Sequence, residues 1–395
     1  MNVKTNEVQV ESGRVGTPRR RRPLPAKGTD GAARRPCLSS PMKMRLALAA
    51  VAGSVCAAAF GQTAVVTHAE LQAVQTNGAS DWAETLPFKI QGVILNDPEE
   101  MLDVAFNPEA AFPPDGGQYQ MFIQAAAEGD RGGTALYMAQ RSVLGDHYDE
   151  ATWSNELQRV MFAGTGRKFR KGDRVEVTAR KAVFYNGKRN VNEMHRTTYS
   201  NDFDVALVQA NVGLPAAEAI TLADLKDADD RAIFDPARES GGEHWQGMRV
   251  RLDGIRLADT NGWGQAAWSN RICIAADATG RTLPLRLPRT DLGRQPPATS
   301  DWFSAVGILN QESDTWIDGY ELFVQEIGPV LHVAQGPHGG VAVQFTTDYE
   351  DFVLEATTNL EGGIWSPVDV TPVRVILMED FSAEPNRNYR LRKRD

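Results

Sequence analysis

The sequence predicts a mainly β protein: two tandem OB-like Greek-key barrels, joined by a linker with a short helix, and then a small β-sandwich-like module. Three observations predict it. Short alternating apolar and polar segments are separated by glycine-containing turns, two five-strand blocks follow the same order, and a Gly/Pro break precedes a last alternating region. The predicted segments are 1–61 (basic arm and signal peptide), 62–85 (lead-in), 86–204 (first OB-like domain), 205–243 (linker), 244–329 (second OB-like domain) and 330–395 (C-terminal β module).

In the first block, alternation predicts strands that include a hairpin over the turn sequence GDRGG. A second hairpin is predicted at Asn186-Gly187, because a type I′ turn requires positive φ at both central residues. Its arms are Arg174–Tyr185 and Lys188–Glu193. The other predicted strands are Pro87–Leu95, Gln118–Ala125 and Thr134–Gln140.

The second block repeats this order after a linker in which Thr221 is the predicted N-cap of a short helix. Trp245–Asp259 alternates like a strand, and Arg271–Pro288 reads as two strands around the turn DATG. WFSAVGILNQ and GYELFVQEI complete the five strands. We therefore infer an internal duplication of a five-strand unit.

The N-terminal region predicts export. Leu46–Phe60 is apolar, too short to span a bilayer, preceded by Lys43 and Arg45, and followed by small residues, so 42–61 reads as a signal peptide. We expect a periplasmic, extracellular or cell-surface location. The exported chain then keeps only Cys273, which excludes an intrachain disulfide and which we interpret as a buried apolar residue.

Charge is distributed unevenly along the chain. The formal net charge is −9, but 1–61 contains 11 basic and 3 acidic residues, so the remainder carries −17. A field of this sign opposes nucleic-acid binding over the whole molecule, because phosphate contacts dominate such affinity.

Several motifs of 86–328 resemble a known family: IQGVIL, QYQMFIQ, KGDRVEVTARKAVFYNGKRNV, VGLPAAEAITL, EHWQGMRVRLDGI and GYELFVQEIGPV. In order and spacing they resemble the OB-like region beside the catalytic domain in secreted nucleases of the endonuclease/exonuclease/phosphatase superfamily. The C-terminal FVLEATTNLEGGIWSPV resembles a small β module of secreted bacterial proteins. The chain has no counterpart of the family's α/β nuclease domain, so the resemblance implies the accessory part alone, and no catalytic residue is carried over.

The first candidate site is a basic hairpin in 167–196, which has ten basic and three acidic residues with aromatic residues interleaved. OB folds bind single strands with a positive groove and aromatic stacking platforms, which suggests single-stranded nucleic acid or another polyanion as partner. The alternative is a solvated hairpin whose charges guard a strand edge. The candidate residues are Arg167, Lys168, Arg170, Lys171, Arg174, Arg180, Lys181, Tyr185, Lys188, Arg189 and Arg196.

The second candidate is the loop NGWGQAAWSN, which favours a carbohydrate or protein interaction module, with a glycan or an envelope protein as partner. Tryptophan rings stack on sugars, and neighbouring amides supply hydrogen bonds. The alternative is that the rings plug a barrel end. The candidate residues are Trp263, Trp268, Asn261, Gln265 and Asn270.

An enzyme is the third interpretation. The sequence contains no G-x-S-x-G, H-E-x-x-H, P-loop or G-x-G-x-x-G motif, and its six histidines lack metal-ligand spacing, so we expect neither a metal nor a cofactor. A hydrolase with an unrecognised carboxylate pair stays open, since such a pair needs no local signature. The sequence therefore predicts an exported, non-catalytic binding or envelope-associated protein.

Overall fold

A computed structural model gives the fold, and the description below covers the residues that it places. They are 63–110, 116–141, 147–164, 166–193, 202–290, 292, 295–312, 315, 317–330, 332–335, 341–345, 352–357, 364–368, 375–379 and 388–393. The signal-peptide prediction at 42–61 lies outside them. Residues 60–395 form one compact unit by their contacts, so the domain boundaries drawn inside that range stay predictions.

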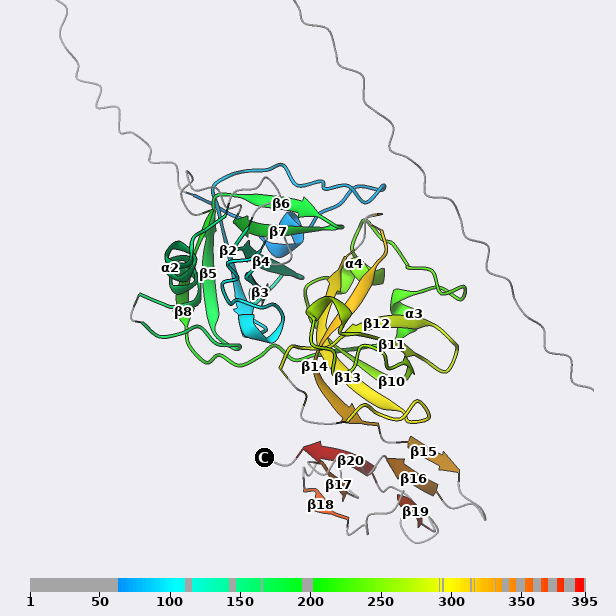
Figure 1. Ribbon diagram of the computed structural model, residues 1–395. Coiled ribbons are helices and arrows are strands. Elements are labelled where there is room, and N and C mark those ends of the chain that lie inside the picture. The colour runs from blue at the N-terminus through cyan, green and yellow to red at the C-terminus, as the bar shows by residue number, and fades with distance from the viewer. Residues whose placement is uncertain are drawn as a thin grey trace, which may run out of the picture. The chain divides into compact units, whose positions relative to one another are not determined.

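The fold class is confirmed as mainly β (Figure 1). Among its described residues the N-terminal half contains eight strands: β1 Ala64–Val65, β2 Phe88–Ile94, β3 Gln118–Gln124, β4 Gly133–Ala139, β5 Arg174–Ala179, β6 Ala182–Tyr185, β7 Lys188–Glu193 and β8 Phe203–Gln209. The next six are β9 Glu218–Ile220, β10 Arg249–Asp259, β11 Ile272–Ala276, β12 Thr282–Arg286, β13 Phe303–Gln311 and β14 Tyr320–Pro329.

Helices are short apart from α2. Their bounds are α1 His68–Leu71, η1 Pro98–Glu100, α2 Glu150–Met161, α3 Leu222–Leu225, α4 Gly241–Trp245 and η2 Trp268–Asn270. The predicted linker helix is α3, and Thr221 caps it as expected, with Asp224 completing a capping box.

The second barrel, strands β10–β14, is a closed five-strand barrel. Its neighbour order is β10-β11-β12-β14-β13 and back to β10, with β12 and β14 parallel and the other pairs antiparallel. Alternate residues point inward, so that Cys273 and Leu285, for example, are completely buried in one core. This is the strand order of an OB-like Greek key.

The first barrel, strands β2–β5 with β6–β8, follows the same order. β2 pairs with β3 and β5, β3 with β4, and β4 runs parallel to β7. The β5–β8 pairing places Ala179 opposite Phe203, and the β6–β7 pairing places Ala182 opposite Val191. Between these two pairings, the second arm of the hairpin (Val191 to Phe203) therefore contains nine more residues than the first arm (Ala179 to Ala182). The predicted arms and the Asn186-Gly187 turn are confirmed, with positive φ at both residues.

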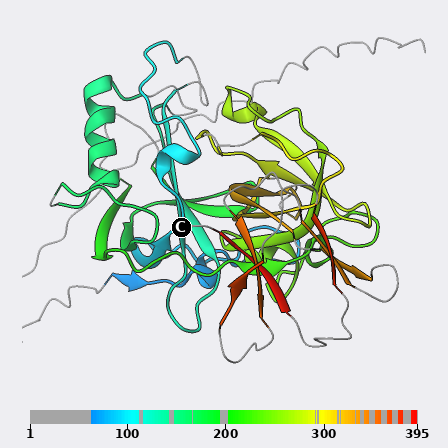
Figure 2. The same cartoon turned by 90° about the horizontal axis from the view of Figure 1, so that it is seen from below.

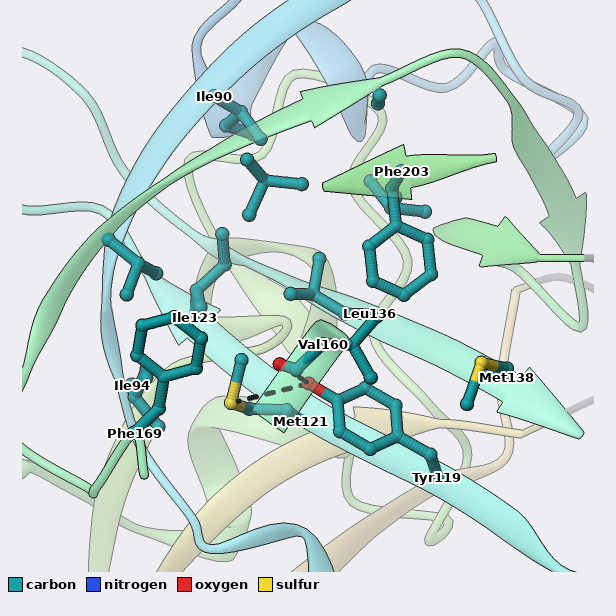
Figure 3. Packing of buried hydrophobic residues seen from close by; sticks show 14 of the residues in the cluster. Ile90, Ile94, Tyr119, Met121, Ile123, Leu136, Met138, Val160, Phe169 and Phe203 are labelled. Atoms are coloured by element: carbon teal, nitrogen blue, oxygen red, sulfur yellow. Dashed lines mark hydrogen bonds between the residues drawn. The ribbon is translucent and has the colours of Figure 1, made fainter. Parts of the chain in front are cut away.

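The helix α2 is an element that the sequence analysis missed. Figures 1 and 2 show its position. Asp149 caps it by accepting a hydrogen bond from the Thr152 amide, and its buried face carries Trp153 and Val160. Figure 3 shows Val160 in the first-barrel core, where its carbonyl oxygen accepts from the Tyr119 hydroxyl at 3.4 Å. The helix thus packs its apolar face into the first-barrel core.

The described residues of the C-terminal module form two three-stranded sheets, β15-β16-β19 and β18-β17-β20, which fits the predicted β-sandwich-like module. Its strands are β15 His332–Gln335, β16 Val341–Phe345, β17 Phe352–Thr357, β18 Ser366–Pro367, β19 Val375–Glu379 and β20 Asn388–Lys393.

Candidate ligand-binding face

Among the described residues, six of the basic residues of the hairpin form ion pairs. Five of the carboxylates, those of Glu84, Glu99, Glu100, Asp204 and Glu312, lie outside 167–196, while two outside cations, Lys89 and Arg159, pair with Glu176 and Asp204. Most of these pairs are partly exposed, so each contributes little to stability, but together they lower the local field. The pairs are Arg167–Asp173 (2.7 Å), Lys171–Glu100 (2.7 Å), Arg180–Asp204 (2.8 Å), Arg189–Glu84 (3.2 Å), Lys168–Glu99 and Lys188–Glu312.

Two of the predicted contact residues, Lys188 and Arg189, are buried. The Lys188 ammonium donates to the Gln311 carbonyl oxygen at 2.8 Å, across to the second barrel. The Arg189 guanidinium lies 4.8 Å from the centroid of the Trp82 ring, and burial lowers its pKa. Both side chains are therefore committed to contacts inside the protein.

The remaining predicted residues of the hairpin differ in exposure. Tyr185 is 57% exposed, Arg170 is exposed, and Lys181 is half-buried; neither cation forms an ion pair with a described residue. Arg174 is half-buried and donates to a glutamine side chain at 3.1 Å. Arg196 lies outside the described residues.

The outward face of β3 and β4 is covered by the second barrel. The rings of Phe122 and Phe323 meet edge to face, with centroids 5.7 Å apart, in a buried cluster that includes Ala135 and Ile308. The Gln124 side chain accepts a hydrogen bond from the Arg249 amide at 2.9 Å. In OB folds the face of the second and third strands, here β3 and β4, is the usual ligand-binding surface. That surface of the first barrel is used for packing.

The equivalent face of the second barrel is formed by β11 and β12. Its outward residues are half-buried except Ala276, which is buried, and the residues between them are completely buried. The register places Ile272 opposite Arg286, Ile274 opposite Pro284 and Ala276 opposite Thr282. Because cross-strand partners share a face, these pairs form one mixed apolar and polar surface.

The predicted tryptophan loop connects β10 to β11, beside this face. A Cβ at Gly262 would lie 2.2 Å from the Ile272 carbonyl oxygen, so only glycine allows the loop to approach the β11 backbone this closely. Gly264 has φ +70°. This turn holds Trp263 half-buried against the second-barrel core.

Trp268 lies at the other end of the loop and joins the contact between the barrels. Its ring meets Phe323 edge to face at 5.5 Å, and the Arg286 guanidinium lies 5.1 Å from its centroid. Arg286 also pairs with Glu321 at 2.9 Å. Burial raises the pKa of Glu321, an effect that Arg286 opposes.

The predicted polar partners are exposed on the loop surface. Asn261, Gln265 and Asn270 all face solvent, and the Gln265 amide donates to the Asn261 carbonyl oxygen at 2.9 Å. The structure therefore brings three exposed amide side chains and two half-buried indoles together beside the β11–β12 face.

A cavity of about 180 Å³ that the sequence analysis missed opens beside Trp268. Residues far apart in the chain line it, which explains why no local motif marks it. The first barrel and its loops contribute Asn96, Glu100, Met101 and Lys171, and the second contributes Trp268, Arg286, Pro288, Thr290, Leu292, Phe323, Val324 and Gln325.

The described residues contain no group of three or more histidine, cysteine, aspartate or glutamate side chains placed to hold a metal ion. Burial raises the pKa of the Cys273 thiol to about 11, which makes it a poor nucleophile at neutral pH. In the same part of the chain, no helix has both the length and the apolar character needed to cross a membrane.

Comparisons with known proteins add little. No family model matches the sequence, and no curated protein matches it. Among solved structures, the chain is similar to a replication protein A heterotrimer bound to ssDNA, with a TM-score of 0.23 and 7% identity. The match covers 60% of this chain and 49% of that chain, so it spans about half of the matched chain's length. A TM-score this low supports no conclusion, and the resemblance to the accessory region of secreted nucleases stays a prediction.

Proposed function

We propose that this is an exported, non-catalytic binding protein whose second barrel binds an oligosaccharide on the β11–β12 face and the adjoining tryptophan loop. One observation carries the proposal. The face that OB folds use for oligonucleotides and oligosaccharides is covered in the first barrel by Phe323 and its neighbours, whereas in the second barrel it is half-exposed and flanked by indoles and amides. In this proposal the first barrel binds no ligand and packs against the second barrel.

The charges favour a neutral ligand over a polyanion. Six basic residues of the 167–196 hairpin are held in ion pairs, and residues 62–395 carry −17 in total. A nucleic-acid site gains most of its affinity from unpaired cations near phosphates. A sugar needs instead a ring to stack on and donors and acceptors at its edge, which Trp263 and the exposed amides of Asn261 and Gln265 supply.

The proposal is tested by retention of the purified protein on insoluble cellulose, chitin, xylan and peptidoglycan, with Trp263→Ala beside the wild-type chain. We expect retention on at least one of them and its loss in the variant. The matched control is Tyr185→Ala, which removes an exposed aromatic ring from the first barrel and should leave retention unchanged. Circular dichroism checks that each variant is folded.

A nucleic-acid arm separates the two binding interpretations. Among the described cations of the hairpin, Arg170 and Lys181 form neither an ion pair nor a hydrogen bond to another side chain. Fluorescence anisotropy of labelled single-stranded DNA should show no binding that depends on these two residues. Salt-dependent binding that Arg170→Glu and Lys181→Glu abolish, together with no retention on any polysaccharide, would contradict the oligosaccharide proposal.

A further inference from the structure

We infer that the cavity beside Trp268 binds a single neutral, hydroxyl-bearing ring, the size of one sugar unit, and so forms a terminal subsite of the proposed oligosaccharide face. The inference rests on the proposed function and deepens it, because it names the part of the ligand that this cavity would select. Three properties carry it: the size of the cavity, the pairing of its charges and the chemistry of its walls.

The size fits one ring. The cavity volume is about 180 Å³. Sites for drug-sized ligands usually enclose about 300–1,000 Å³. The cavity is therefore on the scale of one ring, such as the end unit of a sugar chain, and not of a drug-sized ligand.

The charges around the cavity are paired with one another. Lys171 pairs with Glu100 at 2.7 Å, and Arg286 with Glu321 at 2.9 Å, so the two cations are balanced by two carboxylates. A phosphate or carboxylate bound there would lie beside the carboxylates that already balance these cations, and their like charge opposes it. A hydroxyl group donates to a carboxylate and accepts from an N–H at the same time, so it can bind beside both members of a pair without breaking it.

Arg286 retains hydrogen-bonding capacity at the cavity. Of its five N–H groups, the one on Nε is directed to Glu321, and Nη1 donates to the Trp268 carbonyl oxygen at 3.3 Å. Its Nη2 makes no hydrogen bond to a described residue. The guanidinium lies over the Trp268 ring and is held by the Glu321 carboxylate, so its Nη2 donors are pre-oriented for a ligand oxygen.

The walls also suit a sugar. Phe323, Pro288 and Leu292 give the apolar surface that the C–H groups of a pyranose contact, while Asn96 and Gln325 are already hydrogen-bonded within the protein. Thr290 is exposed at the cavity and lies on the same chain segment as β12, so the cavity adjoins the β11–β12 face. A chain lying on that face could place its last unit in the cavity.

The test is ¹⁹F NMR of the full chain labelled with 5-fluorotryptophan, in which Trp268→Phe assigns one of the eight tryptophan resonances. The probes are glucose, galactose, N-acetylglucosamine, xylose and inorganic phosphate, each titrated separately. We expect at least one sugar to shift the Trp268 resonance saturably and phosphate to leave it unchanged. Glu100→Gln should weaken that binding by about fivefold through loss of one charge-assisted hydrogen bond.

Two variants control this result. Thr290→Phe fills the cavity from its exposed side and should abolish the shift of the Trp268 resonance. Lys181 does not line the cavity, so Lys181→Met should leave that shift unchanged. A Trp268 resonance that no sugar shifts, or that phosphate shifts equally well, overturns the inference. If the protein is still retained on a polysaccharide through Trp263, only the terminal subsite fails; if a sugar fills the cavity but no polysaccharide retains the protein, only the wider proposal fails.

Discussion

Phe122 of the first barrel and Phe323 of the second meet edge to face, with ring centroids 5.7 Å apart and planes at 89°. Phe122 stands on β3, in the part of an OB-like barrel that commonly contacts ligand, and here it contacts the protein itself. Phe323 in turn meets Trp268 at 5.5 Å. One ring therefore links the covered face of the first barrel to the loop beside the exposed face of the second.

The first prediction concerns this ring pair. Phe323→Ala should lower the free energy of unfolding by about 3–5 kcal/mol, because it opens a cavity in a cluster where the ring is only 3% exposed. A double-mutant cycle with Phe122→Ala, measured by urea denaturation, should give a coupling of about 0.5–1.5 kcal/mol. Strict additivity would show that the two rings do not interact.

The buried end of the hairpin gives a second prediction. Lys188→Met should cost about 2 kcal/mol, because it removes the buried ammonium that donates to the Gln311 carbonyl oxygen and pairs with the Glu312 carboxylate. Lys181→Met is the matched control and should change the unfolding free energy by less than about 0.5 kcal/mol. Equal effects of the two substitutions would mean that Lys188 is as solvated as Lys181.

We expect the free energy of unfolding to depend on pH through the Asp173 carboxylate. Burial alone raises its pKa, but hydrogen bonds from Arg167 and from the amides of Asn211 and Arg170 outweigh this, so the folded pKa lies below the unfolded value. The carboxylate therefore stabilises the fold at neutral pH, and this contribution is lost as the pH falls through the folded pKa.

Asp173→Asn isolates that contribution. The wild-type chain should be more stable than the variant by about 2–3 kcal/mol at neutral pH, and the difference should shrink in acid, below the unfolded pKa. Urea denaturation of both proteins across the acid range measures it. A difference that stays constant with pH would exclude a titrating role for Asp173.

A fourth prediction concerns the tryptophan loop. Gly262→Ala should destabilise the protein and weaken polysaccharide retention together, because the added Cβ would lie 2.2 Å from the Ile272 carbonyl oxygen and force the loop off β11. Gly264→Ala, where nothing lies within 4 Å of the added carbon but φ is +70°, should cost only about 1 kcal/mol of strain. Full retention by Gly262→Ala would contradict a fixed loop.

Local patterns were sufficient to predict much of the fold. The Asn186-Gly187 turn and the Thr221 cap depend on residues within a few positions of each other, and both are confirmed. The α2 helix was missed because its sequence, EATWSNELQRVM, is polar over most of its surface and buries few side chains, Trp153 among them. Its Asp149 N-cap was the signal that could have marked it.

The sites were less predictable, because their character depends on distant partners. In the sequence Lys188 and Arg189 look like free cations, but their carboxylates lie 124 and 105 residues away. The cavity combines Lys171 with Arg286, which no local spacing connects. Strand alternation gives the face of a side chain, but it does not show what covers that face.

The most direct test is hydrogen–deuterium exchange of the full chain, with and without soluble fragments of the retained polysaccharide and, separately, single-stranded DNA. We expect the sugar to slow exchange in 260–276 and in β12, to leave β6 and β7 unchanged, and the DNA to protect neither region. Protection of β6 and β7 by DNA, with none of 260–276 by any fragment, would contradict the account and return the binding site to the basic hairpin.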